Sequence, residues 1–138
     1  MKYMIMLYGS QDDYDAMVGK SAGKPAWSAA DYQAMGEFMV TFHNELAESG
    51  ELVDAQGLVE PVRTRRVAMK NGAPVVTDGP YPESQEVLAG YTIVDCESFD
   101  RATEIGLKIA QCPPGPSGAE GQYLDIRAID NGPGEYGV

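Results

Sequence analysis

Two segments, residues 2–8 and 87–94, have the composition of β-strands and are apolar on both faces. In the first segment alternate residues form the two faces, with Tyr3, Ile5 and Leu7 on one side and Met4, Met6 and Tyr8 on the other. Both faces must be covered, because a soluble monomer rarely exposes an apolar patch on the order of several hundred Å². This requirement constrains the fold more than any other feature of the chain.

Capping signals predict two helices. Ser28, followed by Asp31 at the third helical position, predicts the start of a helix that ends at Gly50. Ser98 predicts the start of a second helix, which must stop before Pro113. Both segments have apolar residues at helical spacing, so each helix is expected to bury one face against a sheet.

Further strands are expected at residues 52–59, with a bulge at Gly57, and at residues 122–129. Between them residues 63–77 predict a hairpin that turns at Asn71-Gly72. Without the hairpin the order is βαββαβ, the ferredoxin-like α+β arrangement. Its two helices cover one face of the sheet. We therefore expect a second copy of the chain to cover the other face, which predicts a homodimer joined through the sheet.

Length, composition and charge limit the domain organisation, the location and the possible partners of the chain. Among 138 residues, residues 1–130 are expected to form a single domain and residues 131–138 a flexible tail. The net charge of -11 argues against binding to nucleic acid or to an anionic membrane surface. No apolar run approaches the ~18 residues of a membrane span. No export signal precedes the first strand, so a cytoplasmic location is expected. The single histidine argues against a multi-histidine metal site, and we expect no metal or other cofactor.

Two loops stand out. Residues 78–86 follow an apolar run and begin with Asp-Gly-Pro, a stiff turn sequence. This loop carries a phenol and three acids, Tyr81, Asp78, Glu83 and Glu86. Residues 9–27 are acidic and contain several glycines, and we expect them to form a long mobile loop that acts as a lid. Loops held by a rigid sheet commonly carry binding and catalytic groups. These segments are therefore expected to border a cleft.

Short motifs extend from residue 1 to about residue 130: Met1-Lys2-Tyr3-Met4 with Leu7-Tyr8, Glu45-Leu46, Gly50 with Gly57-Leu58, Thr77-Asp78-Gly79-Pro80-Tyr81, Glu86-Val87-Leu88-Ala89-Gly90-Tyr91 and Phe99-Asp100-Ala102. Together they resemble the YCII-related proteins of the DGPF type. The resemblance implies a dimeric α+β barrel built from ferredoxin-like subunits, in agreement with the pattern of elements. Two positions depart from the family, where Tyr81 replaces a phenylalanine and Gln85 replaces a frequent lysine.

Asp78 and His43 are the candidate catalytic residues. His43 lies on the apolar stripe of the first helix. There it would act either as a general acid or base, or as a core histidine bonded to a backbone group. Asp78 stands on the stiff loop, where it would either activate water or a substrate hydroxyl, or cap its own turn.

Tyr81, Tyr91, Arg66 and Glu86 are the candidate substrate-binding residues. The tyrosines would either orient a polar ring or simply pack, and Arg66 belongs to a basic cluster that would either hold a carboxylate or form a solvated or salt-bridged hairpin. Two functions stay open. One is a cofactor-independent enzyme acting on a small carbonyl-bearing or aromatic metabolite by acid/base chemistry in a barrel cleft. The other is a non-catalytic domain that binds a small ligand or another protein.

Overall fold

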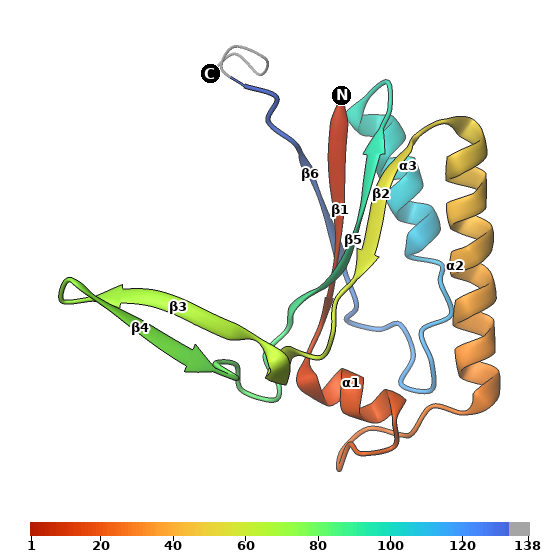
Figure 1. Ribbon diagram of the computed structural model, residues 1–138. Helices are drawn as coiled ribbons and strands as arrows, with labels where there is room; N and C mark the ends of the chain where they lie inside the picture. The colour runs from red at the N-terminus through yellow and green to blue at the C-terminus, as the bar shows by residue number, and fades with distance from the viewer. Residues whose placement is uncertain (133–138) are drawn as a thin grey trace.

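The computed structural model describes residues 1–132, which form an α+β fold with one four-stranded and one two-stranded antiparallel sheet (Figure 1). The elements in chain order are β1 (Lys2–Gly9), α1 (Gln11–Met17), α2 (Ala29–Ser49), β2 (Leu52–Gly57), the 3-10 helix η1 (Pro61–Arg63), β3 (Arg65–Lys70), β4 (Ala73–Asp78), β5 (Val87–Asp95), α3 (Phe99–Ile109) and β6 (Leu124–Ala128). The tail predicted at residues 131–138 lies, from residue 133 onward, outside the described residues.

The main sheet has the strand order β2-β5-β1-β6, and all neighbouring strands are antiparallel. This is the order that the βαββαβ connectivity predicts, so the ferredoxin-like arrangement is confirmed. Both long helices, α2 and α3, lie on the same side of this sheet (Figure 1). The sheet of one chain is open and does not close into a barrel. A barrel of the kind implied by the family resemblance would therefore need a second subunit.

The core lies between the main sheet and the two long helices. Its buried side chains are Tyr3, Ile5, Phe42, Leu46, Val94, Cys96, Ala102, Ile105 and Ile109. Ile5 is fully buried and Tyr3 is 3% exposed, so these alternate residues of β1 face the helices. Met4, Met6 and Tyr8 therefore belong to the other side of the sheet, which we call the open face.

Local capping positions both long helices as predicted. Ser28 forms a reciprocal capping box with Asp31 at the start of α2, and Gly50 ends that helix in the left-handed conformation at a φ of 80°. Ser98 caps α3 by accepting a hydrogen bond from the backbone of the first turn. These boundaries fix which face of each helix meets the sheet.

The prediction of a loop from residue 9 to residue 27 is wrong for residues 11–17, which form α1. Ser10 caps this helix in a capping box with Asp13, and Asp13 also forms an ion pair with Lys24. Burial raises the pKa of Asp13, but the hydrogen bonds from Lys24 and Ser10 outweigh it and lower that pKa below its usual value. Asp13, one of the acidic residues of the predicted mobile loop, thus caps and anchors a short helix.

Strands β3 and β4 with their turn form a separate hairpin, which we call the arm (residues 65–78). The Asn71-Gly72 turn has positive φ at both residues, 52° and 79°, as a tight hairpin turn requires. Lys70 pairs with Ala73 across it, which confirms the predicted turn. Every residue of both strands is exposed. The arm extends away from α2, beyond the opposite side of the main sheet (Figure 1).

Candidate functional site

The candidate site is a cavity of about 210 Å³ between α2 and the main sheet. Residues from β1, α2, β2 and β5 form its walls: Leu7, Met39, His43, Ala55, Gln56, Gly57, Ala89, Gly90, Tyr91 and Thr92. The lining is mainly apolar and includes a few polar side chains. This combination is typical of small-molecule sites, where apolar walls cover the ligand and isolated polar groups orient it.

The pairing of β2 with β5 shapes one wall of this cavity. The register of the two strands shifts between Leu52 and Asp54, so the predicted bulge at Gly57 is wrong in position. Beyond the shift, Gly57 lies opposite Gly90, and a Cβ atom at Gly90 would lie 3.0 Å from the backbone oxygen of Gln56. Glycine is therefore required where the strands approach each other beside the cavity.

His43 lines the cavity and carries a buried hydrogen-bonding atom that is unused. Its ring lies 5.4 Å from that of the buried Phe42, measured between centroids. The Nε2 atom is buried and has no hydrogen-bond partner among residues 1–132. A neutral imidazole nitrogen either donates or accepts, and a buried polar atom without a partner is uncommon in folded proteins. The interpretation of His43 as a satisfied core histidine therefore does not hold at Nε2.

Tyr91 contributes to the same wall, but its hydroxyl group is engaged elsewhere. It donates a hydrogen bond to Asp54 Oδ2 at 3.0 Å, and this bond raises the pKa of the Tyr91 phenol. Tyr91 pairs with Met6 across the sheet, and opposite residues of antiparallel strands share a face. The hydroxyl group therefore belongs to the open face and not to the His43 cavity.

Asp78 lies at the end of β4, where the arm joins the fold. Its carboxylate accepts hydrogen bonds from Arg65 Nε at 2.7 Å and from Arg65 Nη2 at 3.3 Å. Both side chains are about two thirds exposed, at 67% and 68%. Asp78 is not among the residues that line the His43 cavity. The structure thus does not bring the two candidate catalytic residues together.

Tyr81 and Arg66, two of the candidate binding residues, do lie together. The Arg66 guanidinium carbon is 5.3 Å from the centroid of the Tyr81 ring, a cation–π geometry. Tyr81 also lines a second cavity of about 320 Å³ at the base of the arm, together with Leu58, Val59, Pro61, Thr64, Val87 and Leu88. Apart from Thr64 and Tyr81 this lining is apolar, so it offers few groups for chemistry.

Glu86, the fourth candidate binding residue, belongs to a cluster of tyrosines and carboxylates. A hydrogen bond with Glu86 raises the pKa of Tyr123, whose ring lies 5.2 Å from that of Tyr8. The Tyr8 hydroxyl donates to Asp125 Oδ2 at 2.8 Å. Sequence reasoning missed this cluster. Alternation along a strand indicates which residues share a face, but it does not give the register between β1 and β6. In the observed register Met6 pairs with Asp125, and this brings Asp125 within reach of the Tyr8 hydroxyl.

Three further observations concern metals, membranes and thiols. Within residues 1–132, histidine, cysteine, aspartate and glutamate side chains form no group of three that could hold a metal ion. No helix in the same range is both long and apolar enough to cross a bilayer. Cys96 and Cys112 are free thiols, the first buried and the second partly buried.

The fold and the site define a ferredoxin-like α+β domain with a mainly apolar cavity and one histidine in its wall. Residues 1–124 match the YCII-related domain, and the chain belongs to that family. The resemblance to YCII-related proteins seen in the sequence motifs is thereby confirmed at the level of the family. A similar protein is an uncharacterised protein of Rhizobium meliloti (strain 1021), 25% identical over 101 residues, which cover 73% of this chain and 82% of that protein.

Proposed function

We propose that this chain binds a small molecule in the cavity between α2 and the main sheet, with His43 as the polar anchor. The buried Nε2 atom, which has no partner among residues 1–132 and belongs to a side chain lining the cavity, is the observation that supports this proposal. A carbonyl or hydroxyl group of a ligand would complete the hydrogen bonding of Nε2, while Leu7 and Met39 would cover an apolar or aromatic part. The ligand class is thus a small carbonyl-bearing or aromatic metabolite.

The same imidazole can move a proton on the bound molecule, which would make the chain an enzyme that uses acid/base chemistry without a cofactor. In this proposal His43 is the catalytic residue. Asp78 is better suited to stabilising the base of the arm, because its carboxylate already accepts hydrogen bonds from Arg65. One observation favours the alternative of a non-catalytic binding domain. Apart from His43 and Tyr91, none of the lining residues has an ionisable side chain, and the Tyr91 hydroxyl is bonded to Asp54.

The ring signals of His43 provide a direct test, because the chain has one histidine. Small phenols, aldehydes and 2-oxo acids would be screened by NMR against the wild type, the His43→Gln variant and a control, Asn44→Gln, at the exposed neighbouring position. We expect binders to shift the His43 signals, and to bind at least about tenfold more weakly to His43→Gln, the loss of one buried hydrogen bond to a ligand. Equal affinity for both variants would contradict the proposal.

The same samples separate the enzyme from the binding domain. A ligand that is converted by the wild type, and left unchanged by His43→Gln, would support acid/base catalysis. A ligand that binds to the His43 cavity and stays unchanged would support the binding domain. Asp78→Asn, assayed in parallel, is expected to retain both binding and turnover, because its carboxylate is not part of the cavity.

We also propose that the chain forms a homodimer through the open face. Met4, Met6 and Ile93 occupy its centre and are only partly covered, and Tyr8 and Tyr91 lie beside them. A second copy related by a two-fold axis would cover these side chains. Sedimentation equilibrium should give about 30 kDa, twice the chain mass of 14.8 kDa. Met6→Glu should give the monomer, whereas Val40→Glu, at a position on α2 that is 61% exposed, should leave the dimer intact.

A further inference from the structure

The two faces of the arm differ in chemistry. Opposite residues of β3 and β4 share a face, and one face combines the pairs Val67–Val76 and Met69–Pro74. On that face Val67 is 71% exposed, Met69 68% and Val76 59%. The Arg65–Asp78 pair lies on the same face at the base of the arm, and the other face carries Arg66 and Lys70 beside Ala68, Ala73, Val75 and Thr77. The arm is thus amphipathic, and its apolar face is exposed within residues 1–132.

A hairpin of this kind does not support itself. Two strands without a third, and without a helix packed on them, are at best marginally stable in water. All residues of both strands are exposed, so the other described residues, up to residue 132, leave the apolar face of the arm accessible. Exposed apolar strands of this type are recognition surfaces or sites of aggregation. The ordered Asn71-Gly72 turn and the Arg65–Asp78 ion pair at the base hold the arm in a defined shape for recognition.

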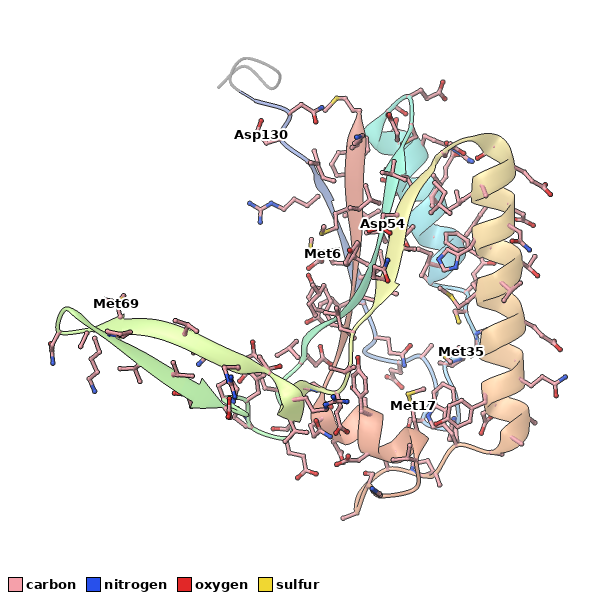
Figure 2. The ribbon with its side chains drawn as sticks, viewed as in Figure 1. Met6, Met17, Met35, Asp54, Met69 and Asp130 are labelled. Atoms are coloured by element: carbon pink, nitrogen blue, oxygen red, sulfur yellow. The ribbon has the colours of Figure 1, made fainter. Side chains whose placement is uncertain are left out.

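Charge and direction favour a second copy of the chain as the partner of the arm. The arm has three basic residues and one acidic residue, a net charge of +2, whereas the other residues have 7 basic and 20 acidic residues, a net charge of -13. A second copy of this chain therefore offers a surface of opposite charge to the arm. The arm also extends toward the side of the sheet on which Met6 lies, which is the side of the open face (Figure 2).

We propose that the arm of each subunit packs its apolar face against the other copy of the chain, so that the two arms make reciprocal contacts across the dimer. The inference rests on the homodimer proposed above and assigns to the arm a share of the binding energy. Val67, Met69 and Val76 lose their exposure in the dimer, and the arm, with its net charge of +2, lies against a partner of opposite net charge.

The test compares two double variants on the same strands. Val67→Ser with Val76→Ser removes two valines from the apolar face, and Ala68→Ser with Val75→Ser places the same two serines at the adjacent pair on the other face, where one valine is lost. We expect the first double variant to weaken the dimer at least about tenfold in sedimentation, because two buried valines are lost from each arm. The second should dimerise within about threefold of the wild type.

The outcomes distinguish the proposed role of the arm from the proposed dimer contact through the open face. If Met6→Glu dissociates the dimer while Val67→Ser/Val76→Ser does not, the open-face dimer holds and the role of the arm is overturned. If the two arm variants weaken the dimer equally, the effect is not specific to the apolar face, which also overturns it. A wild type that sediments as a monomer overturns both proposals.

A second measurement leaves the arm unaltered. In an equal mixture of isotope-labelled and unlabelled wild-type chains, isotope-filtered NMR detects contacts only between subunits. We expect contacts from the methyl groups of Val67 and Val76 to protons of the unlabelled chain. A dimer that shows contacts from Met6 but none from the arm would contradict the inference, whatever the variants do.

Discussion

Among single residues, His43 is notable because its buried Nε2 atom lowers the free energy of unfolding. The folding of the chain alone does not explain why such an atom is retained. A buried polar atom left without a partner costs about 1–3 kcal/mol of stability. Such costs are commonly retained where a side chain is needed for binding or chemistry. His43 Nε2 is the only buried side-chain nitrogen or oxygen atom within residues 1–132 in this condition.

We therefore expect His43→Leu to keep the stability of the wild type or to raise the free energy of unfolding by about 1 kcal/mol. The variant should lose the ability to bind the ligands found in the NMR screen. Urea unfolding followed by circular dichroism measures the first effect. A loss of more than about 1 kcal/mol would indicate that the imidazole serves packing and not ligand binding.

The Glu51–Arg101 pair predicts a dependence of stability on pH. Arg101 Nε and Nη2 donate to the two Glu51 oxygens at 2.9 and 2.8 Å. These bonds lower the pKa of Glu51 from 4.5 to about 2. Because the pKa is lower in the folded state, the pair contributes stability that is complete above pH 4.5 and is lost as the pH falls toward 2.

We expect Glu51→Gln to lower the free energy of unfolding by roughly 1–2 kcal/mol at pH 7. The difference from the wild type should shrink between pH 4.5 and pH 2, the window of the Glu51 shift. Glu104→Gln removes the more exposed partner of Arg101 and should cost less than about 0.5 kcal/mol. Urea titrations at several pH values measure all three proteins, and a difference that does not depend on pH would refute this explanation.

Among elements, the loop after α3 supports the start of α2. Gly115 in this loop packs against Trp27, which precedes the Ser28 cap, and a Cβ atom at Gly115 would lie 2.5 Å from the indole ring. Its φ of +80° also disfavours any other residue. The contact therefore joins two segments that are far apart in the sequence.

We expect Gly115→Ala to lower the free energy of unfolding by about 2–4 kcal/mol, because backbone strain adds to the collision with Trp27. Gly118→Ala is a matched control. Gly118 has nearly the same φ, +77°, but open space around it, so only the strain of about 1–2 kcal/mol applies. Equal losses in the two variants would mean that Trp27 moves aside without cost.

Elements with local signals were predictable from the sequence. The caps at Ser28 and Ser98 and the Asn71-Gly72 turn depend on neighbouring residues alone, and the structure confirms them. The short α1 was missed although Ser10 and Asp13 have the same capping spacing as Ser28 and Asp31, because a seven-residue helix gives little periodicity and Gly19, Gly23 and Pro25 follow it closely.

The candidate site was less predictable than the elements. Leu7, Ala55 and Gly90 come from three strands, and they share a cavity wall only in the observed register, including its shift in β2. His43 could be named because it is the one histidine and lies on an apolar stripe. Its separation from Asp78 depends on the direction in which the arm extends, which local sequence signals do not encode.

The whole molecule has a net charge of -11 and an open face whose apolar side chains are only partly covered. If the native form is the proposed dimer, its stability follows mass action, because unfolding also separates the subunits. We expect the midpoint of thermal unfolding to rise by about 2 °C for each tenfold increase in protein concentration, given an unfolding entropy typical of a protein of the dimer's size. Differential scanning calorimetry measures this. Met6→Glu should show a midpoint that does not change with concentration, and the same behaviour in the wild type would exclude the dimer.

The base of the arm is closed, because Gly79 N donates a hydrogen bond to Thr64 O at 2.8 Å and the chain leaves and re-enters the fold at the same point. No strand of the main sheet pairs with the arm. The arm is therefore an inserted module, whose length and side chains can diverge among related chains without disturbing the register of the sheet or the cavity beside α2. Under the inference drawn above, two kinds of selectivity are encoded in separate segments. The arm selects which chain a subunit pairs with, and the cavity selects which small molecule it binds, so each can evolve without altering the other.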